Sequence, residues 1–335
     1  MDMGRYLFRQ VRGSDAAAIY ELAVANEYHS DNLPLNRSLI KAYVQRSVKD
    51  FAIISSSGVC KNPLYMFVLE DTYTRTVVGV SQIKNILWRL LYQLRLDPFL
   101  GENIGKLALK KEDGTWELGG LLLSKEVRGG KLGKLLSYGR LAYLMSKGLA
   151  PRMLISGFLK NTFWEYIAIR IGVSKEYNPD KHWRSFKTLT KFMGLLPAHI
   201  LLAETGIAFG YFEDLFKIPI PIKPESEPAR KLLVDMGLCF LKEIEANGIL
   251  WHGAPWKVIR DDNFMRYKVP QDTIEVDTCK TSCHLDIGMA VLPSDDFRAQ
   301  YIPVAKLEDG RVYISKKDFS CGKPKHLFIF ETKNV

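Results

Sequence analysis

The stretch WELGGLLLSKEVRGGKLGKLLSYGRLAYLMSKG, residues 116–148, decides the predicted fold. Its first nine residues form an apolar run that is typical of a buried strand. The Arg-Gly-Gly sequence at 128–130 then predicts a turn, and Gly133 opens a long helical segment. Glycines let a backbone approach a ligand closely, and the free amides of a first helical turn attract anions. The stretch therefore predicts a strand, a turn and a helix that together can hold a phosphate group.

Positive charge gathers around this turn. Five basic residues fall within sixteen positions of the sequence: Lys125, Arg128, Lys131, Lys134 and Arg140. The other positive charges are spread along the chain, so the formal net charge of +10 indicates a solvated basic surface rather than a nucleic-acid partner. The turn matches neither the P-loop nor the dinucleotide-binding glycine pattern. A diphosphate-containing ligand of another class fits it.

The sequence before this stretch predicts an α/β domain. Residues 5–11 alternate loosely as a strand does, and residues 16–26 and 35–51 repeat apolar positions at helical spacing. Residues 65–71 and 77–83, joined by a polar turn, predict a β-hairpin. This mixed order of helices and strands favours an α/β domain with a partly antiparallel sheet.

The remaining segments carry weaker patterns. Residues 84–115 predict an irregular insertion, with part of 86–95 expected to be helical. Residues 151–159 predict a strand, and residues 228–244 predict a helix, a glycine and a second strand. The last seventy residues are rich in strand patterns, which indicates a small β appendage or an extension of the sheet.

Composition excludes several classes of protein. The 335 residues are 47% hydrophobic and 25% charged, which is typical of a globular chain and unlike a disordered one. No apolar run reaches the roughly 18–20 residues of a membrane helix, and we see no signal-peptide core, so we expect a cytosolic protein without a membrane partner. Cys279, Cys283 and His284 lie close in sequence, but they lack a convincing fourth zinc ligand. We therefore expect reduced thiols and no metal.

The glycine-rich turn resembles a pattern of the GNAT acyltransferase superfamily. These enzymes carry [QR]-x-x-G-x-[GA] between the fourth strand and the next helix, where it holds the diphosphate of acyl-CoA. The segment RGGKLG at 128–133 fits at Arg128 and Gly133, whereas Lys131 stands where the pattern has glycine.

A closer resemblance is to the arginine N-succinyltransferase family. The blocks that carry it follow the family's order over nearly the whole chain: FVLEDTYTRTVVGVSQI at 67–83, LGKLLSYGRLAYL at 132–144, NTFWEYIAIRIG at 161–172, PARKLLVDMGLCF at 228–240 and FRAQYIPVAKLEDGRVYIS at 297–315. Residues 84–110 depart from the family's usual text, and HGAPW at 252–256 replaces an acidic-glycine turn. The resemblance therefore determines the fold more closely than the substrate specificity.

The resemblance implies an α/β fold of GNAT type, a mixed sheet flanked by helices. It implies two GNAT-like units in tandem, residues 1–175 and 176–262, followed by a small β-rich extension at 263–335. The implied reaction transfers a succinyl group from succinyl-CoA, as cosubstrate rather than resident cofactor, to the α-amine of L-arginine or ornithine. Family members commonly assemble as oligomers, so we expect a homo-oligomer and take a dimer as the first guess.

The resemblance also assigns roles to residues. The acyl-CoA site would be formed by Leu121, Leu122, Leu123, Arg128, Gly129, Gly130, Lys131, Leu132, Gly133 and Lys134. Backbone amides at 121–123 would polarise the thioester carbonyl as negative charge develops on its oxygen. The first candidate for the general base is His199, followed by His182 and Glu165.

Substrate contacts are the least determined part of this prediction. Glu70 and Asp71 could bind the guanidinium of an arginine acceptor, although the same pair could simply form a turn. Arg140 could bind the succinyl carboxylate. Two alternatives stay open: a GNAT-type acyltransferase with another acyl group or amine, and a noncatalytic descendant that binds a metabolite or a protein.

Overall fold

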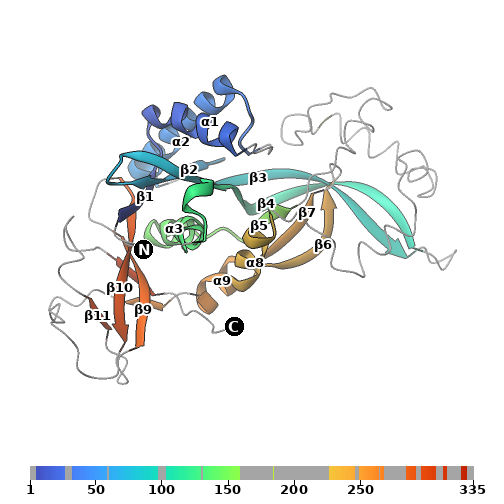
Figure 1. Cartoon of the computed structure of the whole chain (residues 1–335). Coiled ribbons are helices and arrows are strands. Elements are labelled where there is room, and N and C mark those ends of the chain that lie inside the picture. Colours follow the sequence, from blue (N-terminus) through green and yellow to red (C-terminus); the bar gives the residue numbers. More distant parts are fainter. Residues whose placement is uncertain are drawn as a thin grey trace. The chain divides into compact units, whose positions relative to one another are not determined.

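The computed structural model describes residues 5–26, 32–58, 60–96, 103–129, 131–158, 184, 226–245, 249–263, 265–267, 284–291, 296–306, 312–314 and 326–329. The helices are α1 (Ala16–Ala25), α2 (Arg37–Ser57), α3 (Leu132–Ser146), α8 (Glu227–Asp235) and α9 (Trp256–Asn263), with short 3-10 turns η2 (Gly13–Asp15) and η3 (Lys125–Val127). The strands are β1 (Tyr6–Gln10), β2 (Leu64–Asp71), β3 (Thr76–Leu96), β4 (Asn103–Leu123), β5 (Met153–Phe158), β6 (Cys239–Glu245), β7 (Leu250–Pro255), β8 (Met265–Tyr267), β9 (His284–Val291), β10 (Arg298–Lys306), β11 (Val312–Ile314) and β12 (His326–Ile329) (Figure 1).

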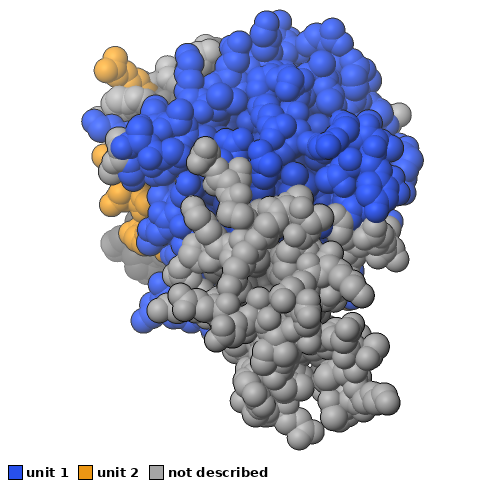
Figure 2. All heavy atoms as spheres, turned by 90° about the vertical axis from the view of Figure 1, so that its left-hand side faces the viewer, with its two compact units in different colours: residues 1–84, 118–150, 256–335 blue, residues 85–117, 151–255 orange. Residues whose placement is uncertain are grey.

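The chain divides into two compact units that interleave along the sequence. Unit 1 comprises residues 1–84, 118–150 and 256–335, and unit 2 comprises residues 85–117 and 151–255. Figure 2 distinguishes the two units by colour. The predicted division into 1–175, 176–262 and 263–335 is contiguous, unlike these units, and it stays a prediction, as does the tandem arrangement.

Unit 1 is built on an antiparallel sheet. β1 pairs with β2 on one side and with β10 on the other, and β2 pairs with β3. The C-terminal strands continue from β10, which pairs with β9 and β11. Of the two alternatives for the last seventy residues, the described strands therefore favour an extension of the sheet.

Aromatic side chains fill the core of unit 1. The ring of Phe67 on β2 lies 4.9 Å from Phe8 on β1 and 5.1 Å from Tyr143 on α3. Phe51 from α2 packs on the same ring at 5.4 Å. A Cβ atom at Gly139 of α3 would come within 2.7 Å of the Phe8 ring, so the absence of a side chain there lets α3 approach β1 closely.

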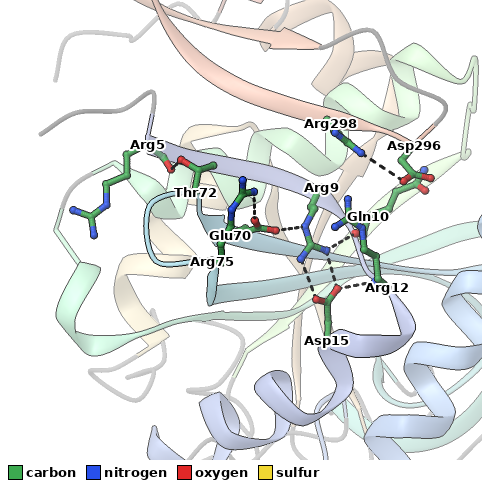
Figure 3. Close-up of polar contacts among 10 residues, drawn as sticks. All are labelled: Arg5, Arg9, Gln10, Arg12, Asp15, Glu70, Thr72, Arg75, Asp296 and Arg298. Atoms are coloured by element: carbon green, nitrogen blue, oxygen red, sulfur yellow. Dashed lines mark hydrogen bonds and ion pairs between the residues drawn. The ribbon is translucent and has the colours of Figure 1, made fainter. Parts of the chain in front are cut away.

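Buried ion pairs fasten β1 to β2. The Arg9 guanidinium donates to Glu70 at 2.6 Å and to Asp15 at 2.7 Å, and Arg75 reaches Glu70 at 3.3 Å (Figure 3). Burial alone would raise the pKa of Glu70, but its hydrogen bond to Arg9 lowers it below the ordinary value. Because each carboxylate has an arginine partner, these charges can lie inside the fold.

Unit 2 contains the part of β3 that follows residue 84 and the part of β4 that precedes residue 118. β5 pairs in parallel with β4 at residues 115–117 and antiparallel with β7. β6 pairs antiparallel with both β7 and β3. The prediction that 84–115 is an irregular, partly helical insertion is therefore wrong wherever the structure describes that segment. Its apolar residues are interrupted by Arg89, which suggests a helix with a solvated face, but the side chain of Arg89 is only 1% exposed.

The burial of Arg89 depends on a polar network within unit 2. Its guanidinium donates to Glu112 at 2.8 and 2.6 Å and lies 2.7 Å from a carboxylate oxygen of Glu243. It also stands over the ring of Trp251, with 5.4 Å from its central carbon to the ring centroid. The indole of Trp251 in turn donates to Glu245 at 2.6 Å. Long-range charge pairing of this kind leaves no periodic signal in the sequence.

We expect Arg89→Met to lower the free energy of unfolding by about 3–5 kcal/mol, because it leaves buried carboxylates without their cation. Arg37→Met is the matched control, since the pair between Arg37 and Glu21 is exposed (67% and 62%). Its loss should cost about 0–1 kcal/mol. Denaturant titration measures both values, and equal effects of the two substitutions would contradict this account of the network.

A second prediction concerns acid stability. Hydrogen bonds from Arg5 hold the pKa of Asp71 at about 2, below its ordinary 3.8. Since the pKa is lower in the folded state, this carboxylate stabilises the fold above about pH 4 and loses that contribution as the pH falls towards about 2. Asp71→Asn and Arg5→Met should each flatten the decline of the free energy of unfolding across this range. Denaturant titrations at successive pH values would contradict the assignment if both variants declined as steeply as the wild type.

Candidate functional site

The candidate site begins where β4 ends and the chain turns into α3. The amide of Ser124 donates to the carbonyl of Val78 on β3 at 2.8 Å, and η3 follows directly. Gly129 then has a φ of 87° and Lys131 a φ of 62°, both in the left-handed region. The predicted strand, turn and helix are therefore all present, although Gly130 lies outside the described residues.

The first turn of α3 has free backbone donors. Lys131 is the N-cap residue, and its side chain makes no capping hydrogen bond, because an ammonium group has no acceptor atom. Its carbonyl accepts from the amides of Lys134 at 2.9 Å and Leu135 at 3.3 Å. In the described part of the chain, the amides of Leu132 and Gly133 have no bonded acceptor, as expected at a helix start.

Neither glycine of this segment that the structure describes is crowded at its Cβ position. A Cβ atom built on Gly133 would meet nothing within 4 Å, and the same holds for Gly129. Lys131 is exposed and Lys134 is half-buried. The helix start thus combines unsatisfied donors with nearby positive charge, which is the arrangement that binds phosphate groups.

Two contacts fix the conformation of the turn. The hydroxyl of Tyr301 on β10 donates to the Lys131 carbonyl at 3.4 Å, and burial raises the pKa of Tyr301, so the hydroxyl keeps its proton. Arg128 donates to the carbonyl of Leu123 at 3.1 Å and to the Asn26 side chain at 2.9 Å. Arg128, predicted as an acyl-CoA contact, therefore also ties the turn to β4 and to the end of α1.

A residue that the sequence analysis missed lies in β4. Gly120 has a φ of 57° inside the strand, a conformation found where a strand bulges. Gly120 directly precedes Leu121–Leu123, whose amides are the predicted donors to the thioester oxygen. The paired glycines of ELGGLLL were the signal in the sequence, because glycine inside a strand pattern often marks such a bulge.

Arg140 braces this part of the sheet. Its side chain is fully buried, and its guanidinium donates at 3.4 Å to the carbonyls of Gln82 on β3 and Gly119 on β4. These contacts hold the two strands beside the bulge. Its predicted role with the succinyl carboxylate stays a prediction.

The other predicted residues fall into two groups. Glu70 and Asp71 are buried, with their oxygens bonded to Arg9 and Arg5 of the same chain. His199, His182 and Glu165 lie outside the described residues, so their roles stay predictions.

Two features are absent from the part of the chain that the structure describes. No cluster of three or more His, Cys, Asp or Glu side chains in this part could hold a metal ion. None of the helices in this part is both long and apolar enough to cross a membrane.

Comparison with known proteins gives a family match and a structural similarity over nearly the whole chain. Residues 6–87 match the family model described as arginine N-succinyltransferase beta subunit. The arginine/ornithine succinyltransferase subunit AI from Pseudomonas aeruginosa superposes with a TM-score of 0.69 at 16% identity, over 97% of this chain and 98% of that one. A search of curated proteins found no match.

Two further solved structures superpose with lower scores. A GNAT-family acetyltransferase from Desulfovibrio desulfuricans gives a TM-score of 0.37 at 8% identity, over 75% of this chain and 99% of that one. The ribosomal-protein-S5-alanine acetyltransferase from Vibrio fischeri also gives 0.37, at 11% identity, over 75% and 93%.

The predicted mixed α/β fold is confirmed. The family that residues 6–87 match is one of acyltransferases, and the structural similarity shows the shared fold. The resemblance found in the sequence is thereby confirmed: residues 6–87 match the arginine N-succinyltransferase family, and the chain has the fold of an arginine/ornithine succinyltransferase.

Proposed function

We propose that this protein is an acyl-CoA-dependent N-acyltransferase that moves a succinyl group from succinyl-CoA to the α-amine of L-arginine or ornithine. The observation that carries the proposal is the start of α3, where the amides of Leu132 and Gly133 have no bonded acceptor among the described residues and the basic Lys131 and Lys134 stand beside them. The name of the matching family and the fold of the Pseudomonas aeruginosa protein supply the choice of acyl group and acceptor.

The geometry of unit 1 suits direct transfer from a thioester. The diphosphate of the coenzyme would accept hydrogen bonds from the first-turn amides, and the positive charges of Lys131 and Lys134 would attract it. A backbone amide after the Gly120 bulge would donate to the thioester oxygen as the amine attacks. The new C–N bond replaces the C–S bond, the thiolate leaves, and a base takes the proton of the amine; His199, His182 and Glu165 remain the proposed bases.

Two other functions stay in consideration. Residues 84–110 and the HGAPW segment depart from the resembled family, which favours a second acyltransferase reading with another acyl group or amine. Lys131 at a glycine position favours a noncatalytic binding protein. We also propose a homo-oligomer, with a dimer as the first expectation, since the matching family is described as a subunit. The cytosolic location stays a prediction.

A thiol-release assay separates these readings. We expect thiol release from succinyl-CoA in the presence of arginine or ornithine, and little release without an amine. Release only from acetyl-CoA, or only with other amines, would support the second reading. Binding of CoA without release of thiol from any acyl-CoA would support the noncatalytic reading.

A substitution at Gly133 tests the coenzyme site. Gly133→Glu places a carboxylate in the first turn of α3, where it favours the helix but repels a diphosphate. We expect the affinity for CoA, measured by titration calorimetry, to fall by about tenfold or more while the melting temperature stays close to that of the wild type. Gly133→Ala is the control and should keep most of the affinity, because its Cβ meets no neighbour. Equal CoA affinity in the wild type and Gly133→Glu would contradict the placement of the diphosphate.

A further inference from the structure

Gln82 on β3 carries a buried hydrogen-bond acceptor that the fold does not use. Its side chain is 1% exposed, and in the described part of the chain its Oε1 has no hydrogen-bond partner. The orientation of the amide is fixed, because Nε2 donates to the carbonyl of Asn32 at 2.9 Å. Buried polar atoms without partners are rare and often belong to functional sites.

The location of this acceptor links it to the proposed site. A Cβ atom at Gly120 would come within 2.9 Å of Nε2 and 3.0 Å of Cγ of Gln82, so the side chain packs directly on Gly120 of β4. The next residues of β4 are Leu121–Leu123, whose amides are the proposed donors to the thioester oxygen. An attacking amine must lie about 3–3.5 Å from the thioester carbon, which is beside those same donors.

We propose that Oε1 of Gln82 binds the acceptor amine, an inference that rests on the proposed function. The neutral oxygen accepts one N–H of the amine and directs its nitrogen towards the thioester, and the proton that leaves during the reaction goes to a separate base. A primary amine has one hydrogen for Gln82 and another for the base. A secondary amine has to share a single hydrogen, so Gln82 selects primary amines.

Steady-state kinetics test this proposal with two variants. Gln82→Met keeps the length of the side chain and removes the acceptor, so we expect KM for the amine to rise about three- to tenfold while KM for succinyl-CoA changes less than about twofold. We also expect the preference for a primary amine over its N-methyl analogue to shrink in the variant. A merely structural role would not move that preference.

Ser81→Ala is the matched control. Ser81 precedes Gln82 on β3, so the two side chains lie on opposite faces of the strand. Ser81 pairs with Phe67 of β2, and its hydroxyl donates at 3.4 Å to the carbonyl of Leu136. The substitution Ser81→Ala removes a buried polar group from the same strand without touching the proposed amine site. We expect both KM values and the amine preference to stay within about twofold of the wild type.

The outcomes separate this proposal from the proposed function. If the wild type releases no thiol with any amine, the proposed function fails first. If the wild type is active and Gln82→Met keeps its KM for the amine, or raises both KM values equally, the role of Gln82 is overturned. Should Gln82→Met not fold, the ¹⁵N side-chain amide resonance of Gln82 in the wild type gives the answer: it should shift when the amine joins the CoA-bound protein, and an unchanged resonance overturns the proposal.

Discussion

The left-handed backbone of Lys131 is the constraint on which the proposed site depends. A residue with a side chain pays about 1–2 kcal/mol for this conformation, which glycine adopts freely. The structure holds it through the Tyr301 hydroxyl and through the first turn of α3. This conformation sends the chain from the turn into α3 with its amides unsatisfied. Because Tyr301 belongs to β10, the C-terminal part of the chain helps to hold Lys131 in this conformation.

Buried arginines organise the sheets of both units. Arg9 joins β1 to β2, Arg140 spans β3 and β4 beside the bulge, and Arg89 gathers carboxylates in unit 2. Such buried cations contribute little net stability, since desolvation offsets much of the attraction. Removing one member leaves an uncompensated charge, however, so each arginine specifies which strands lie together. Under the proposed function, the placement of Arg140 matters because the substrates would meet the backbone beside Gly120 and Gln82.

Local patterns in the sequence were enough to predict most of unit 1. The hairpin of β2 and β3, the buried end of β4, the turn and α3 follow from periodicity and from glycine positions, which report on neighbours in sequence. The strands at 84–115 could not be recognised, because Arg89 becomes compatible with a buried strand only through Glu112 and Glu243. Gln82 gave no signal either, since only the folded sheet places it on Gly120. The ion pairs of Glu70 with Arg9 and of Asp71 with Arg5 gave no signal in the sequence either, and the substrate role of the two carboxylates stays a prediction.

A crystal structure of the complex with CoA tests the central claim most directly. The account predicts diphosphate oxygens within about 3.2 Å of the backbone nitrogens of Leu132 and Gly133, with the thiol end of the coenzyme beside Leu121–Leu123. Coenzyme bound elsewhere, with those two amides facing solvent, would contradict it.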